Sequence, residues 1–148
     1  MKDSNPSILE NRSNYKKFKT PNPVVKFLLN NFYSKIKNIV SEIECTSFLD
    51  AGCGQGMTLQ YLADMLPAKV KAFDFDPACI EYAKEKFPSV DFCVADISKL
   101  PFKDKSFDLS ICLEVLEHLP SQKRECRNYY GSLKIILYCQ YRMNLILP

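Results

Sequence analysis

The sequence lacks any hydrophobic run near the length of about 20 residues that spans a bilayer. Its first 20 residues are polar and basic, without the apolar stretch of a secretion signal. Internal repeats and low-complexity segments are also missing. These absences argue against membrane, secreted and repeat proteins, and we expect a cytoplasmic location.

Cysteine pairs at metal-binding or redox spacing are absent as well. The chain has seven cysteines but no Cys-x-x-Cys, and several stand in apolar, strand-like runs such as residues 92–94 and 111–113. An odd number cannot all form internal disulfides. The pattern therefore argues against a secreted disulfide framework and a structural zinc site, and it predicts buried thiols in a reducing compartment.

A strong charge of one sign is missing too. The 148 residues carry a net charge of +3, with 47% hydrophobic and 25% charged residues, as in an ordinary globular domain. Residues 24–120 hold ten Lys and Arg against fourteen Asp and Glu, so only the two ends are basic. A nucleic-acid enzyme is expected to have a basic face beside its active site. We therefore expect a small-molecule substrate and no nucleic-acid partner.

The pattern of apolar residues predicts a series of alternating strands and helices. Asn22-Pro23 is typical of a helix start, and apolar residues recur at helical spacing from Val25 to Ile43. Further helices are expected at residues 57–66, 77–87 and, as a short turn, 114–119. Strands are expected at residues 46–50, 69–73, 90–95 and 107–112.

This alternation predicts an α/β fold with a doubly wound, mostly parallel, Rossmann-like sheet. After residue 120 the topology cannot be derived, although residues 133–139 and 143–147 have the composition of strands. We expect an N-terminal arm at 1–22, a core at 23–120 and an atypical tail at 121–148. The arm is equally consistent with a lid over a ligand and with a mobile basic tail.

Glycine is scarce, but three of the four glycines fall within five residues. The run Phe48-Leu49-Asp50-Ala51-Gly52-Cys53-Gly54-Gln55-Gly56 is a strand that ends at a carboxylate and enters a Gly-x-Gly-x-Gly turn. A dinucleotide places its pyrophosphate in such a turn, where the charge of Asp50 would repel it. A ligand with positive charge and no phosphate, such as S-adenosylmethionine, would instead be attracted.

Together these motifs resemble class I S-adenosylmethionine-dependent methyltransferases, and within them the methyltransferase type 11 group that includes ubiquinone and menaquinone biosynthesis enzymes. The resemblance covers about residues 24–120 and includes FLDAGCGQG, LPF followed by SFD, and EVLEHL. It implies a class I methyltransferase sheet, incomplete at its C-terminal edge, with S-adenosyl-L-methionine as cofactor. The resemblance places the methionine part of the cofactor beside Asp50, Ala51, Gly52, Cys53, Gly54, Gly56 and Leu113.

Two further acids end predicted strands. By the resemblance, Asp74 accepts the ribose hydroxyls, with Asp76 as the fallback; the plainer alternative is that both acids solvate a loop and cap a helix. Asp96 and the backbone of Ile97 would bind the adenine. Phe75 would form an apolar wall for its ring.

The chemistry of the acceptor side is less defined. Glu114, Glu117 and His118 fall on one face of the expected turn, so a metal site is an alternative, but the chain has no second histidine and we predict no metal. His118 is also an alternative as a general base or positioning group, against a purely structural role. No catalytic residue is therefore assigned.

The resemblance stops after Pro120, where the family's Pro-Gly-Gly turn and further helix pattern are missing. We expect a truncated or frame-altered C-terminus. One alternative is accordingly a catalytically silent S-adenosylmethionine-binding module. A second is an NAD(P)-dependent dehydrogenase, against which the glycine spacing and Asp50 argue. The oligomeric state and the acceptor are left open.

Overall fold

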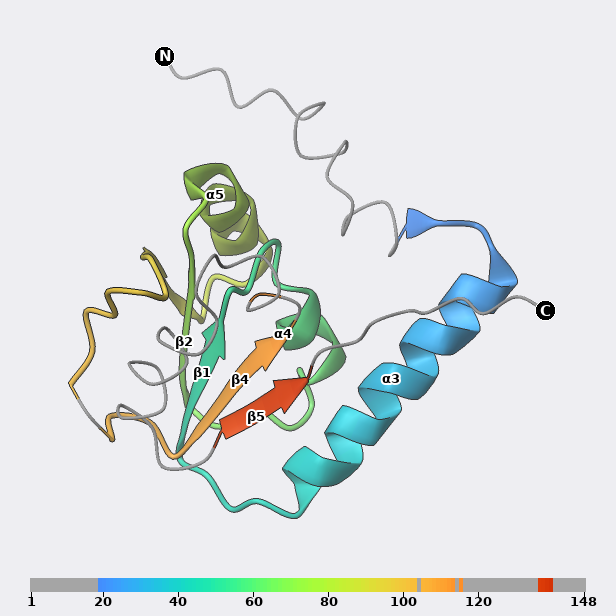
Figure 1. Ribbon diagram of the computed structural model, residues 1–148, viewed down its shortest axis with the longest axis horizontal. Helices are drawn as coiled ribbons and strands as arrows, with labels where there is room; N and C mark the ends of the chain where they lie inside the picture. Colours follow the sequence, from blue (N-terminus) through green and yellow to red (C-terminus); the bar gives the residue numbers. More distant parts are fainter. Residues whose placement is uncertain (1–18, 104, 114, 116–135, 140–148) are drawn as a thin grey trace.

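A five-stranded parallel sheet forms the centre of the molecule, seen in the computed structural model (Figure 1), which describes residues 19–103, 105–113, 115 and 136–139. The strand order is β3-β2-β1-β4-β5, and every neighbouring pair is parallel. The strands are β1 (Ser47–Ala51), β2 (Lys69–Asp74), β3 (Asp91–Val94), β4 (Leu109–Leu113) and β5 (Ile136–Cys139). The predicted α/β, doubly wound parallel sheet is confirmed.

Three helices accompany the strands: α3 (Pro23–Ser41), α4 (Met57–Tyr61) and α5 (Pro77–Lys86). The predicted start of α3 is confirmed, because the Asn22 side chain accepts hydrogen bonds from the N–H groups of Val24 and Val25 at 2.9 and 3.4 Å. Helix α3 is held beside α4 by Tyr33, which stacks on Tyr61 with ring centroids 4.0 Å apart. No helix in the described part of the chain is both long and apolar enough to cross a bilayer.

The two faces of the sheet carry two separate apolar clusters, as the alternation of side chains along a strand requires. Phe48, Ala72 and Ile111 point to the face covered by α3, α4 and α5. Leu49, Phe73 and Cys112 point to the other face and pack with residues that follow β3, such as Ile97 and Phe107. The segment between β3 and β4 thus covers the second face and closes the core.

Two expectations differ from the structure in detail. The helix predicted at 57–66 ends at Tyr61, and the chain continues in a turn where the Met65 N–H donates to Leu62 O at 2.8 Å. Pro67 limits any continuation beyond this turn, because the residue before a proline avoids the helical region. The tail supplies β5, inside the strand expected at 133–139 and parallel to β4. The expected turn at 114–119 lies outside the described residues except for Val115, and the strand at 143–147 lies wholly outside them.

Candidate functional site

The candidate site lies at the carboxyl ends of the strands, where the chain order places a switch point. Strand β1 is central, with β2 on one side and β4 on the other, so connections leave it in opposite directions. In open parallel sheets such a point leaves a crevice beyond the strand ends. Asp50, Asp74 and Leu113 stand at the carboxyl ends of β1, β2 and β4, and Asp96 follows β3 by two residues. The topology thus brings the predicted residues to one edge.

The glycine loop, residues 52–56, bends sharply over this edge. The N–H groups of Gly52 and Cys53 both donate to Phe73 O, at 2.8 and 2.9 Å, which ties the loop to β2. Gly54 has φ +51°, and a Cβ on it would meet no atom within 4 Å. Gly52 has φ +75°, and a Cβ there would lie 2.2 Å from Val115 Cγ2. Gly54 therefore borders open space, whereas Gly52 is required by close packing.

Asp74 fixes the middle of this loop. Its carboxylate is 9% exposed, with Oδ2 accepting from Gly54 N at 2.8 Å and Oδ1 accepting from Asp76 N at 3.0 Å. Asp76 is the N-cap of α5, and its Oδ1 accepts from Ala78 N at 2.9 Å. The helix-capping alternative is therefore correct for Asp76, while Asp74 remains at the strand end.

Asp50 is the most unusual residue of the site. Its side chain is 1% exposed, and in the described part of the chain no group donates to Oδ2. Burial, followed by the nearby charge of Asp74, raises the pKa of Asp50 to about 8. A buried carboxyl without a partner is costly, and native structures keep one mainly where a ligand or ion completes it.

Cys53 lies beside these acids and is buried. Burial raises the pKa of its thiol, and the charges of Asp50 and Asp74 raise it further. The thiol therefore stays protonated and inert, in line with the expectation of buried thiols. Like Cys53, the residues Cys45, Cys79, Cys93 and Cys112 form no disulfide with another described residue.

The residues expected around the adenine occupy the same edge with different exposure. Phe75, directly after β2, is 76% exposed, whereas Ile97 is buried in the second cluster. Asp96 is exposed and accepts from Ser98 N at 2.8 Å, and this backbone hydrogen bond lowers its pKa. Leu113 is buried. The ring of Phe75 is thus free to contact a ligand.

Gln55 was missed by the sequence reasoning. Its side chain is buried, and its Nε2 has no hydrogen-bond partner among the described residues. The only signal was its place between Gly54 and Gly56, which does not reveal whether a side chain points inward. The glycine loop therefore carries one unpartnered donor close in sequence to the unpartnered acceptor of Asp50.

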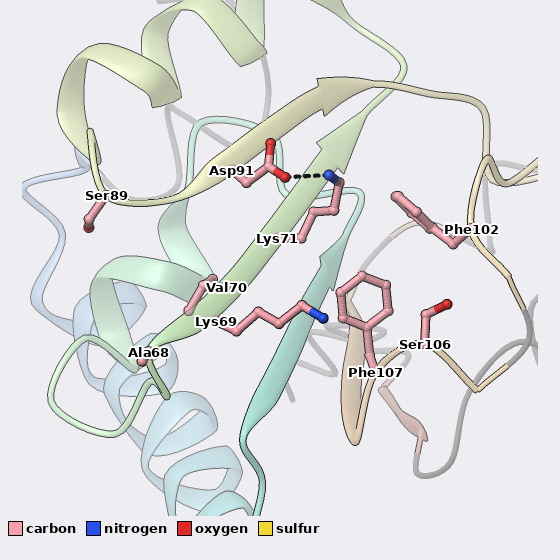
Figure 2. A pocket seen from close by; sticks show the side chains of 9 residues that line it. All are labelled: Ala68, Lys69, Val70, Lys71, Ser89, Asp91, Phe102, Ser106 and Phe107. Carbon is pink, nitrogen blue, oxygen red and sulfur yellow. Dashed lines mark hydrogen bonds and ion pairs between the residues drawn. The ribbon is translucent and has the colours of Figure 1, made fainter.

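A second hollow lies at the opposite, amino end of the strands (Figure 2), with a volume of about 390 Å³. Lys71 forms an ion pair with Asp91 and lies 5.7 Å above the centre of the Phe102 ring, while Lys69 lies 5.9 Å above Phe107. These contacts hold the segment before β4 against β2. The hollow is separate from the glycine loop.

Metal ligands are not assembled in the described residues: no group of three or more His, Cys, Asp or Glu side chains there is placed to hold an ion. The alternative metal set, Glu114, Glu117 and His118, lies outside the residues that the structure describes.

Comparison with known proteins decides the family. Residues 49–135, more than half of the chain, match the model of the methyltransferase domain of the type 11 group. The chain belongs to this methyltransferase family.

Relatives of this methyltransferase domain agree with that assignment. It is 35% identical over 104 residues to a ubiquinone biosynthesis O-methyltransferase of Rickettsia felis, covering 68% of this chain and 42% of the relative. It is 34% identical over 88 residues to a Mycobacterium tuberculosis (strain CDC 1551 / Oshkosh) protein assigned to the S-adenosylmethionine-dependent methyltransferases, covering 56% of this chain and 31% of that protein. The methyltransferase domain therefore spans less than half the length of these relatives.

The fold is also shared with a solved structure. A solved structure from Methanococcus maripaludis, assigned to the S-adenosyl-L-methionine-dependent methyltransferases, aligns with a TM-score of 0.71 at 19% identity. The alignment covers 95% of this methyltransferase domain and 65% of that chain. The Rossmann-like architecture is thus shared.

Proposed function

We propose that this domain binds S-adenosyl-L-methionine and belongs to an enzyme that transfers its methyl group to a small-molecule acceptor. The observation that carries the proposal is Asp50, a buried carboxyl with an unpartnered oxygen next to a second acid and an open glycine loop. Such a site favours a ligand that brings positive charge and hydrogen-bond donors. It disfavours a pyrophosphate.

The residues fit the cofactor part by part. Asp50 would accept from its ammonium group, and Ala51, Gly52, Cys53, Gly54 and Gly56 would let the backbone approach the methionine part. Asp74 keeps lone pairs beyond its two backbone bonds and would accept from the ribose hydroxyls. Phe75, with Asp96 and Ile97, would bind the adenine. Leu113 would border the methionine part.

The reaction asks for positioning more than for acid or base chemistry. When bound, the cofactor supplies an electrophilic methyl group on a sulfonium. The domain's own residues hold it: the two acids fix the ends of the methionine and ribose parts, and Leu113 contributes apolar surface that excludes water. No described residue is assigned as a catalytic base.

The class of acceptor and the cellular location are inferred from a relative, from the charge of the core and from the cysteines. The Rickettsia felis relative is a ubiquinone biosynthesis O-methyltransferase, which supports a small-molecule acceptor here. The mildly acidic core of this chain favours an uncharged or cationic acceptor over nucleic acid. The absence of disulfides among the described cysteines, Cys45, Cys53, Cys79, Cys93 and Cys112, fits a reducing cytoplasm.

Calorimetric titration with S-adenosylmethionine, S-adenosylhomocysteine and NAD tests the ligand class. We expect both adenosyl compounds to bind and NAD not to bind. Asp74→Ala should weaken binding by about 1–3 kcal/mol, since it removes a charge-assisted acceptor. Asp74→Asn keeps one acceptor for the Gly54 N–H and should lose less. Asp91→Ala, at the opposite end of the sheet, is the matched control. Preferred binding of NAD would refute the proposal.

Turnover separates an enzyme from a silent binding module. A panel of phenol, quinol and amine acceptors with labelled S-adenosylmethionine should give a methylated product with at least one class. Binding without transfer to any of them would support the silent module instead.

A further inference from the structure

At the carboxyl end of β1, two neighbouring acids lie without a described cation to balance their charge. Asp50 and Asp74 lie close enough for their charges to interact, and neither forms an ion pair with a described residue. Asp74 receives two backbone N–H donors, whereas none reaches Asp50 Oδ2. Asp50 thus lacks the hydrogen bonds that would stabilise an ionised carboxylate, and its burial beside a second acid favours the protonated form.

Within the part of the chain that the structure describes, the surroundings of Asp50 offer no cation to replace that proton. Cys53 faces it from the glycine loop, and Cys79 of α5 lies near Cys53. Strand β4 places the apolar Ile111 in register with Asp50, and α4 has no charged residue. Asp76 is occupied as the helix cap of α5.

The lysines of β2 do not supply this positive charge either. Lys69 and Lys71 alternate with Val70 and Ala72 along the strand, so they lie on the other face, over Phe107 and Phe102. The charged side chains of α5 after its cap, at positions 81, 84, 85 and 86, are exposed. Since no described residue places a positive charge beside Asp50, the ligand is the source that this proposal considers.

We propose that Asp50 exchanges a proton for the ammonium group of its ligand, which makes it the residue that selects an amino-acid-bearing adenosyl compound over a neutral nucleoside. The inference rests on the proposed function. The carboxyl proton leaves Asp50 for the solvent, and the resulting carboxylate accepts an N–H of the ligand's ammonium. The site thereby gains one attractive ion pair and keeps its net charge.

This exchange predicts a particular pH dependence. Below the pKa of about 8 in the empty site, binding must expel close to one proton, so Kd should fall about tenfold for each pH unit between about pH 5.5 and 7. Near about pH 8 the dependence should flatten, because Asp50 is then largely ionised before the ligand binds and because the ligand's own amino group begins to lose its proton.

Calorimetry at about pH 6.5 in two buffers of different ionisation enthalpy measures the exchange directly. S-adenosylmethionine and S-adenosylhomocysteine should each release about one proton. The probe 5′-methylthioadenosine, which lacks the ammonium, should release none, and its Kd should not change with pH. Since the wild-type protein alone gives this result, the test does not depend on a variant that folds.

Two variants test whether Asp50 is the residue that releases the proton on binding. Asp50→Asn should abolish proton release and bind S-adenosylmethionine more weakly at about pH 7.5, with a Kd that no longer varies with pH. Asp91→Asn removes a carboxylate at the far end of the sheet and should release protons as the wild type does.

Two outcomes overturn the inference, and they can be told apart. Tight binding of S-adenosylmethionine without proton release would refute the exchange and leave the proposed function standing. No binding of either ammonium-bearing compound from about pH 5.5 to 8.5 would refute the proposed function and, with it, the exchange.

Discussion

A single residue, Asp50, links the stability of this domain to its ligand site. Its pKa rises from an ordinary 3.8 to about 8 in the folded state. At pH values between 3.8 and about 8, the Asp50 carboxyl keeps a proton in the folded protein that it has lost in the unfolded chain. The free energy of unfolding should therefore decrease as pH rises through that window, by up to about 1.4 kcal/mol per pH unit.

Asp50→Asn should remove this decrease, because the amide carries no proton that titrates in this range. Urea unfolding at about pH 5, 6, 7 and 8 should give a flatter profile for the variant than for the wild type. Asp91→Asn should keep the wild-type slope. If Asp50→Asn were as pH-sensitive as the wild type, the buried proton would belong to another group.

The two glycines beside this residue should respond differently to alanine. Gly54→Ala forces a left-handed conformation worth about 1–2 kcal/mol, but its methyl group enters open space. Gly52→Ala adds to the same cost a close contact with Val115. We expect the larger loss of stability at Gly52, and at Gly54 a loss of adenosyl affinity beyond its loss of stability. Equal thermal midpoints for both variants would contradict this distinction.

At the scale of elements, one carboxylate joins the amino ends of β1 and β4. Asp108 Oδ2 accepts from the N–H of Thr46 and of Ser47, at 3.0 and 3.1 Å, and from both of their hydroxyls, at 2.8 and 2.9 Å. Asp108 N donates in return to Ser47 O and Oγ. The SFD string, used above only as a family motif, therefore also contains the residue that sets the register of the central strands.

Asp108→Ala should destabilise the domain by about 1–3 kcal/mol, because it leaves partly buried donors unpaired. Asp64→Ala is the comparison, since Asp64 forms only an exposed ion pair with Lys37 and should cost at most about 1 kcal/mol. Chemical denaturation of both variants tests the difference. Similar losses would mean that the Asp108 cluster contributes no more than a surface pair.

Elements with a clear local pattern could be predicted from the sequence, and those set by distant contacts could not. Helix α3 was predicted because Asn22, Pro23 and the apolar spacing are local signals. The strand segment that became β5 was identified by composition, but its parallel pairing with β4 depends on contacts that no local pattern encodes. The early end of α4 was not predicted, because residues 62–65 contain no glycine or proline that would mark it.

In the candidate site, too, features with a local signal could be predicted and features set by distant contacts could not. The strand-end position of Asp50 was predictable from the adjacent glycine turn, and that of Asp74 from the apolar run that it ends together with the family resemblance. The missing partners of Asp50 Oδ2 and Gln55 Nε2 were not, because burial and satisfaction depend on neighbours from several elements. The proposed contacts of Phe75, Asp96, Ile97 and Leu113 stay predictions.

At the scale of the whole molecule, ligand binding and folding should be coupled. A ligand that binds only the folded state at about 100 times its Kd adds about 2.7 kcal/mol to the free energy of unfolding. At one fixed concentration, S-adenosylhomocysteine should therefore raise the thermal midpoint more at about pH 7.5 than at about pH 6. The shift caused by 5′-methylthioadenosine should be equal at the two pH values. Differential scanning fluorimetry measures both, and a shift by S-adenosylhomocysteine that does not grow with pH would contradict the coupling.

The bond from Gly54 N to Asp74 Oδ2 has a practical consequence for protein engineering. If Asp74 binds the ribose as proposed, an attempt to accept a cosubstrate with a modified sugar would begin by replacing this acid at the end of β2. The same replacement would release the backbone of the neighbouring turn, so altered selectivity would come with a loosened scaffold. A successful redesign therefore needs a paired change that provides a new acceptor for that amide.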